Sequence, residues 1–81
     1  MQVRVFVTPR QGILDPQGRA VESSLHTLGF KNVSGVKVGK YIVLEIEAAT
    51  PSEARAEAMK MCEALLANPV IEDYRFQVDG E

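Results

Sequence analysis

The sequence predicts an α+β fold with elements in the order β-α-β-β-α-β, and three observations carry this prediction. Apolar and polar residues alternate near both ends of the chain, two longer segments repeat apolar residues at helical spacing, and glycine or proline stands at the joins between segments. A chain of 81 residues has room for one core, so we expect residues 1–81 to form a single domain.

The first two elements are a strand and a helix. Valine occupies every second position of residues 2–8, and this alternation of β-branched residues is typical of a strand. Asp15–Pro16 then indicates a helix start. The carboxylate can accept a hydrogen bond from a free backbone N–H, and proline at the first helical position loses no hydrogen bond, because an N–H there would have no partner in the helix. Apolar residues follow at helical spacing as far as Leu28, and Gly29 suits the left-handed residue after a helix. We therefore predict a helix over about 16–28.

The middle of the chain predicts a hairpin. Residues 33–38 and 41–47 are apolar at alternate positions, and Gly39–Lys40 lies between them as a turn. A three-residue loop is favoured over a two-residue loop, because it brings apolar side chains together on one face of the sheet. In that register the opposed residues are Val38 with Ile42 and Val36 with Leu44.

The last two elements are a helix and a strand. Residues 50–53, Thr-Pro-Ser-Glu, have the form of a capping box, with the cap residue first and glutamate three residues later. The apolar stripe that follows predicts a helix over about 51–66. Asn68–Pro69 ends it, because a residue before proline avoids helical geometry. Alternation over residues 70–78 predicts the closing strand.

Connected by right-handed crossovers, these elements predict a ferredoxin-like fold, a four-stranded antiparallel sheet with two helices on one face. The first and third strands would lie in the middle of the sheet. Its open face would then carry Phe6 and Val43 at the centre and charged residues around them, which is the composition of a protein–protein contact. Because so short a chain has a small core, we expect self-association through this face or along a sheet edge.

Composition excludes several classes of function. The formal net charge is −2 and no basic stripe is present, so the sequence gives no support for nucleic-acid binding. No apolar run reaches membrane-spanning length, and Met1 leads into a strand pattern without a signal segment. The one cysteine, Cys62, cannot form an intramolecular disulfide, which suits a reducing compartment. We expect a cytoplasmic protein.

No catalytic constellation can be recognised in the sequence. Cys62 falls near the apolar stripe of its helix and His26 lies off the stripe of the other, so we interpret them as a buried thiol and a surface histidine. Arg10 lies in the first loop, as in small phosphatases of this fold, but the third strand lacks the asparagine that would orient water. Two alternatives to an assembly subunit stay open: an amino-acid sensor similar to ACT domains, and a small hydrolase.

The order and spacing of several segments resemble the PurS family, the small subunit of phosphoribosylformylglycinamidine (FGAM) synthase. Each segment alone can be explained by a structural role, as a cap, a turn or a core residue. Structural roles do not explain why all the segments occur in this order and at this spacing. The matching segments are residues 14–21 (LDPQGRAV), 28–30 (LGF), 39–40 (GK), 61–63 (MCE) and 65–74 (LLANPVIEDY).

The resemblance implies a role in de novo purine synthesis. In that family a large subunit binds ATP, with Mg²⁺, and the ribonucleotide, and a separate glutaminase subunit releases ammonia. The small subunit is not itself catalytic and binds no cofactor. It forms a homodimer, which could pair again into a tetramer, bridges the two larger subunits and supports ammonia transfer between them. No nucleic acid or membrane is implied.

We assign two contacts from the open face and from the family segments. The residues expected in the homodimer contact are Phe6, Tyr41 and Val43. The residues expected to contact the larger subunits are exposed loop residues: Arg10, Gln17, Lys40, Asn68 and Glu72. No residue is expected to be catalytic, to bind a cofactor or to ligate a metal.

Overall fold

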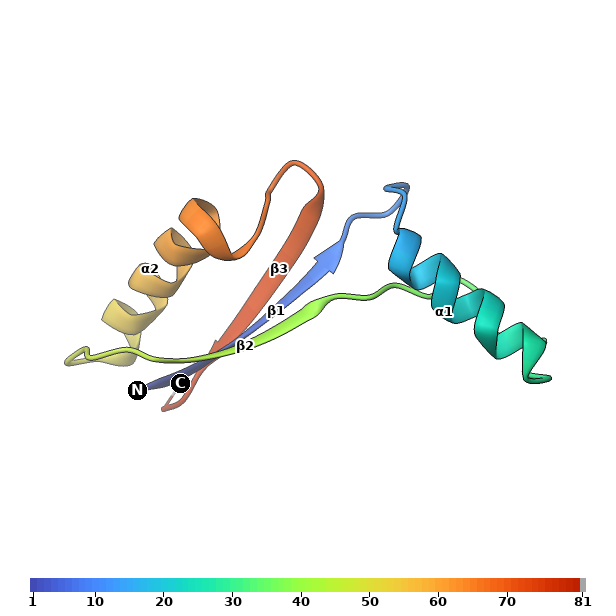
Figure 1. Ribbon diagram of the computed structural model, residues 1–81. Coiled ribbons are helices and arrows are strands. Elements are labelled where there is room, and N and C mark those ends of the chain that lie inside the picture. The colour runs from blue at the N-terminus through green and yellow to red at the C-terminus, as the bar shows by residue number, and fades with distance from the viewer. Residues whose placement is uncertain (81) are drawn as a thin grey trace.

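The computed structural model describes residues 1–80. Figure 1 shows an elongated molecule whose principal extents are 50 × 24 × 14 Å. The elements in chain order are β1 (Gln2–Pro9), α1 (Pro16–Thr27), β2 (Lys40–Glu45), α2 (Pro51–Met61), a π-helical segment η1 (Cys62–Leu66) and β3 (Glu72–Val78).

The sheet is antiparallel and has the order β2-β1-β3, so β1 is the central strand. Val5 of β1 lies opposite Ile42 on one side and Phe76 on the other. The α+β class is confirmed. The prediction of four strands is wrong for the described chain, because residues 33–38 do not join the sheet and three strands remain.

The core lies between the sheet and α2–η1. The three valines of β1 are completely buried, and so are Ala54, Ala58 and Cys62 on the facing helix. Alanine at two successive turns lets the helix backbone lie close to the sheet, where a larger side chain would hold the two layers apart. Burial of the valine face and of the thiol agrees with the sequence analysis.

The second predicted helix is confirmed over its full length, because η1 continues α2 as far as Leu66. The capping box is also present. The Thr50 hydroxyl accepts a hydrogen bond from the Glu53 backbone N–H at 3.2 Å, and the Glu53 carboxylate accepts one from the Ala49 N–H at 3.1 Å. Each of these bonds satisfies a backbone donor that has no partner within the helix.

The first predicted helix has the expected extent but not the expected place. Figure 1 shows α1 beyond the end of the sheet, far from α2, whereas we predicted both helices on one face. The physical reason is the path of the chain after α1. Instead of turning back at Gly39–Lys40, the chain runs on into β2 (Figure 1). The predicted hairpin, with Val38 opposite Ile42, is therefore absent within this chain.

Residues 10–39 form a projection that we call the arm, and we call residues 1–9 and 40–80 the body. In the arm, α1 is joined to the returning segment by side chains from successive turns. The Val38 N–H donates to Asp15 Oδ2 at 2.8 Å, and His26 Nε2 lies 2.7 Å from the Val33 carbonyl oxygen. At Gly18 a Cβ would come within 2.2 Å of the Val36 carbonyl oxygen, so only glycine fits.

The sequence predicted that the Asp15 carboxylate would cap α1. It makes no cap hydrogen bond, because it bonds to the returning segment instead. The bond from the Val38 N–H lowers the pKa of the Asp15 carboxyl below its usual value, and the nearby Gly18 backbone N–H adds to the effect without completing a cap. Asp15 therefore stands at the start of α1, while its side chain holds the arm together.

Candidate interaction surface

The open face of the sheet carries a row of stacked side chains that crosses all three strands. Phe6 lies opposite Tyr41 on one side and Arg75 on the other. The rings of Phe6 and Tyr41 stack with centroids 5.1 Å apart, and the Arg75 guanidinium lies 4.1 Å from the Phe6 ring centroid. Such a cation–aromatic contact is worth about 0.5–1 kcal/mol at an exposed site. The row presents flat, pre-oriented side chains to a partner.

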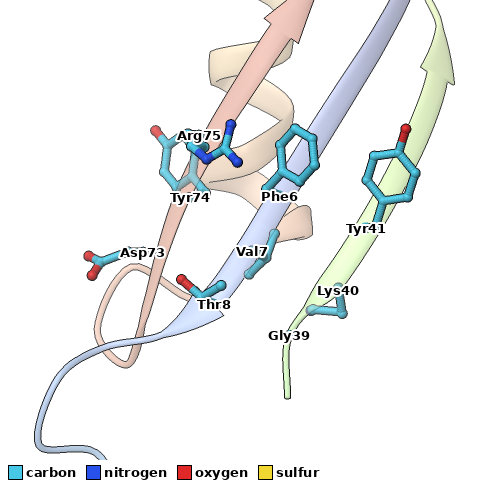
Figure 2. A pocket seen from close by; sticks show the side chains of 9 residues that line it. All are labelled: Phe6, Val7, Thr8, Gly39, Lys40, Tyr41, Asp73, Tyr74 and Arg75. Atoms are coloured by element: carbon cyan, nitrogen blue, oxygen red, sulfur yellow. The ribbon is translucent and has the colours of Figure 1, made fainter. Parts of the chain in front are cut away.

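The row borders a shallow hollow of about 400 Å³ that opens widely to solvent. Figure 2 shows its side chains coming from β1, β2 and β3, with Thr8 and Asp73 beyond Phe6 and Arg75. A site for a small metabolite normally encloses most of its ligand. An open hollow of stacked rings is better suited to a side chain of another protein.

Ion pairs lie around this face. Arg4 and Asp79 approach to 2.8 Å, and Arg10 Nε and Asp73 to 3.5 Å. All four side chains are more than a third exposed, and such pairs contribute about 0–1 kcal/mol each. Their main effect is to hold the charged side chains in place around the apolar centre.

Four of the five residues assigned to the larger subunits gather around Glu72. The Glu72 carboxylate accepts a hydrogen bond from the Asn68 N–H at 2.8 Å and lies 3.9 Å from Lys40 Nζ. Lys40 Nζ also donates to the Leu66 carbonyl oxygen at 3.3 Å, and Arg10 Nε donates to the Glu72 carbonyl oxygen at 3.4 Å.

This group, which we call the Glu72 cluster, consists of Arg10, Lys40, Asn68 and Glu72. It joins both ends of the arm to the turn between η1 and β3. Gln17, the fifth assigned residue, is exposed in the first turn of α1, and no bond joins it to the cluster within residues 1–80. The cluster has a structural role in the monomer. This role explains in part why Lys40, Asn68 and Glu72 occur in the segments that resemble the family.

Three assignments of the sequence analysis can be compared with the structure directly. Phe6, Tyr41 and Val43 lie on the open face, and Tyr41 and Val43 are 58% and 49% exposed. Sequence reasoning missed the direct contact of Arg75 with Phe6, although period two already placed both on one face. It also missed the exposure of the α1 stripe, where Leu28 is 73% exposed, because helical spacing does not say what covers a helix.

The thiol of Cys62, the one cysteine, is buried in the core. Burial raises the pKa of the Cys62 thiol, and the adjacent Glu63 carboxylate adds to this, so the thiolate is disfavoured. Among residues 1–80, no group of three or more histidine, cysteine or acidic side chains is placed to hold a metal ion. Neither helix in that range has the length and apolar character needed to span a bilayer.

Comparison with known proteins connects this chain to a family. A family model for PurS, described as phosphoribosylformylglycinamidine (FGAM) synthase, matches residues 2–80. The PurS subunit of Synechocystis FGAM synthase is 48% identical over 75 residues, which cover 93% of this chain and 75% of that protein. The Bacillus subtilis PurS subunit is 44% identical over 78 residues, covering 96% and 92%.

Solved structures give the same result. PurS of Methanocaldococcus jannaschii, one of the subunits of formylglycinamide ribonucleotide amidotransferase in the purine biosynthetic pathway, is similar with a TM-score of 0.84 and 37% identity, covering 96% of this chain and 94% of that chain. A chain of the Thermotoga maritima PurLQS structure is similar with a TM-score of 0.85 and 34% identity, covering 95% and 94%.

These comparisons lend no support to an ACT-like sensor. A family match over nearly the whole chain, together with relatives of this similarity, shows that the chain belongs to the PurS family of FGAM synthase subunits.

Proposed function

We propose that this chain is the non-catalytic coupling subunit of FGAM synthase, which forms a homodimer and bridges a large synthetase subunit and a glutaminase subunit. The observation that carries this proposal is the Tyr41–Phe6–Arg75 row, in which three side chains from three strands stack on the open face of the sheet. Membership of the PurS family supports the same role, since a Thermotoga maritima relative is part of PurLQS.

The chemistry explains why a synthase would need such a subunit. Ammonia released from glutamine becomes ammonium in water at neutral pH, and ammonium is not a nucleophile. A docked pair of active sites keeps ammonia unprotonated and raises its effective concentration at the acceptor. A coupling subunit therefore acts by fixing the geometry of two neighbours, and it needs no proton-transfer group of its own.

Two surfaces share this work in the proposal. Phe6, Tyr41 and Val43 on the open face form a homodimer contact, because their apolar surface is flanked by paired charges. The Glu72 cluster and Gln17 contact the larger subunits, because they are polar and lie at or near the base of the arm. The paired charges would fix orientation more than they add affinity.

The cofactors and the location follow from the division of labour. ATP and Mg²⁺ would be held by the large subunit, and this chain would bind neither. The proposed location is the cytoplasm, where an unpaired cysteine such as Cys62 is the normal state.

The test is reconstitution with the purified large and glutaminase subunits, with glutamine and Mg-ADP present during assembly. We expect a complex of all three chains in size-exclusion chromatography with light scattering, and glutamine-dependent FGAM formation only when all three are present. Turnover of a metabolite by the purified chain alone would overturn the proposal, and so would full glutamine-dependent activity of the two larger subunits without it.

A surface variant locates the contact. Lys40→Ala removes a cation of the Glu72 cluster, and we expect weaker capture of the larger subunits with unchanged circular dichroism. Lys31→Ala, an exposed lysine outside the cluster, is the matched control and should capture normally. Equal capture by both variants would remove Lys40 from the contact.

A further inference from the structure

Arg75 is the one charged side chain of the open face that has no partner of opposite charge among residues 1–80. Its guanidinium lies over the Phe6 ring, which leaves the positive charge unpaired. The three acidic side chains of this face each lie near a cation of the same chain: Glu45 is 3.5 Å from the Met1 ammonium, Asp73 is 3.5 Å from Arg10 Nε and Asp79 is 2.8 Å from Arg4. The face therefore carries one positive charge in excess, at one end of the aromatic row.

The sheet fixes the place of this charge. Phe6 of β1 and Arg75 of β3 are directly opposed, and the guanidinium carbon lies 4.1 Å from the ring centroid. Figure 2 shows the guanidinium turned towards the Phe6 ring. The N–H donors lie at the edge of the planar group, so the contact with the ring leaves donors free for an acceptor. The side chain is thus held in place before a ligand arrives, which reduces the entropy that binding costs.

The hollow beside Arg75 indicates the kind of ligand. It measures about 400 Å³, opens widely to solvent and is lined on one side by the Phe6 and Tyr41 rings. A free metabolite would remain largely in water there, whereas a side chain of another protein is held by the rest of its own chain. The group that matches a guanidinium is a carboxylate, because both are planar and two parallel N–H···O bonds can join them.

We propose that Arg75 binds the carboxylate of an aspartate or glutamate on one of the two larger subunits. The carboxylate lies in the hollow at the edge of the guanidinium, and the adjoining apolar part of the partner covers the Tyr41 and Phe6 rings. The contact selects its partner, because a surface without an anion at this place would bury the guanidinium unpaired, which is costly. This inference rests on the proposed function and assigns one contact within it.

The position of the hollow fits a contact with the larger subunits. Asp73 lines the hollow, follows Glu72 directly in the chain and lies 3.5 Å from Arg10 of the Glu72 cluster. The hollow is therefore continuous with the cluster that we assign to the larger subunits, and one segment of a partner can cover both.

A second copy of this chain is a poorer source of the carboxylate. The acidic side chains of its open face already lie near cations. The homodimer contact proposed from Tyr41 and Val43 lies on β2, at the other end of the row from Arg75. Two copies joined at their Arg75 ends would bring like charges together, which is unfavourable. The partner that fits is a protein of different sequence.

Binding measurements compare Arg75 with the other arginine of the same face. Arg75→Gln removes the unpaired charge, and we expect the dissociation constant of the complex with the two larger subunits to rise roughly tenfold or more. Arg4→Gln removes a charge that Asp79 already pairs, and we expect a change of less than about threefold. Arg75→Lys should lie between the parent and Arg75→Gln, because lysine keeps the charge without the planar fork.

Two results of this comparison contradict the proposal. Equal weakening by Arg75→Gln and Arg4→Gln would show that only the overall charge of the face matters. An unchanged dissociation constant for Arg75→Gln would show that nothing binds this guanidinium. Circular dichroism of each variant should match that of the parent chain.

Carbodiimide coupling identifies the partner residue directly. The reagent joins a carboxylate to a neighbouring amine and does not use a guanidinium, so Arg75→Lys introduces a reactive amine at the site. In the assembled complex we expect a linked peptide, found by mass spectrometry, that joins position 75 to an acidic residue of a larger subunit. Arg4→Lys is the positive control and should couple to Asp79 of its own chain, because the native pair is 2.8 Å apart.

The coupling has clear adverse outcomes. A link from position 75 to a second copy of this chain, or only to Asp73 of its own chain, overturns the proposal. So does the absence of any link at position 75 when the Arg4→Lys control couples. If the parent chain captures neither larger subunit, the proposed function fails and this inference fails with it. If the parent captures both and Arg75→Gln captures them equally well, this inference alone fails.

Discussion

The body and the arm contain similar local elements but bury them differently. Each has one helix that begins with proline and lies beside extended chain. In the body, α2 closes over a three-stranded sheet and Val5 has no exposed surface. In the arm, α1 lies against a single extended segment, and Leu14 and Leu28 are 67% and 73% exposed. A helix and one extended segment do not make two layers, so the arm has no core of its own.

The two helix starts show the same difference. Thr50 bonds to the N–H of its own helix, so the body helix is satisfied locally. Asp15 bonds to Val38, more than twenty residues away in sequence, so the arm depends on a bond across its own width. Local capping lets α2 start independently of the sheet, whereas the arm is held together only when the returning segment is in place.

The largest expected effect comes from the same substitution made in both regions. Val5→Ala removes buried methyl groups from the body and should lower the free energy of unfolding by about 2 kcal/mol. Val21→Ala in the arm starts from a side chain that is 42% exposed and should cost less than about 1 kcal/mol. Urea denaturation of both variants measures the difference. Equal losses would show that the arm is as tightly packed as the body.

The next effect concerns the capping box. Thr50→Ala removes the acceptor for the Glu53 N–H and should destabilise the protein by about 1 kcal/mol. Thr50→Ser keeps a hydroxyl and should retain most of the stability. Thermal denaturation followed by circular dichroism measures both, and identical melting of the alanine and serine variants would show that the cap contributes nothing.

The arm should lose one of its bonds in strong acid. The Asp15 carboxyl has a pKa below its ordinary value of 3.8, chiefly because the ionised form accepts the Val38 N–H. Its contribution is therefore present above about pH 3.8 and is lost as pH falls through the lowered pKa.

An NMR titration of the Val38 amide measures this response. The resonance should shift with the protonation of Asp15, and Asp15→Asn should abolish the transition. The Ala58 amide in the buried face of α2 should not follow it. A Val38 amide that is indifferent to pH, or an Asp15 that titrates at or above 3.8, would contradict the bond between helix and returning segment.

The smallest effect lies within the body. The Tyr74 hydroxyl donates to the Glu63 carboxylate at 2.6 Å, and this bond to a negative group raises the pKa of Tyr74 to about 12. Glu63→Gln should bring the value down towards 10.0, because the negative partner is removed. Absorbance titration in a Tyr41→Phe background, where Tyr74 is the remaining tyrosine, measures the change. An unchanged titration would show that the contact is not formed in solution.

The predictable parts of the fold are those set by near neighbours. The alternating valines of β1, the capping box at Thr50 and the helix-ending Asn68–Pro69 all act within a few residues, and each has the predicted role. The face of Phe6 and Val43 was also predictable, because period two decides it. Helix bounds at Pro16 and Leu66 follow from the same local rules.

The path of the chain at Gly39–Lys40 was not predictable by the same means. A hairpin and an extended run use the same alternation on either side of Gly39, and the choice between them depends on contacts far away in sequence. For the same reason the apolar stripe of α1 predicted that a helix forms there but not where the helix lies relative to the sheet. The Arg75–Phe6 contact needs the register of two strands, which a single strand pattern does not supply.

The Glu72 cluster has a mechanical consequence for the whole molecule. Arg10 stands where the chain leaves the body and Lys40 where it returns, and both are tied to the one residue that begins β3. The two chain segments that connect the arm to the body, at Arg10 and at Lys40, are thus both held at Glu72. A change in the angle between the arm and the body would therefore have to stretch these contacts at Glu72.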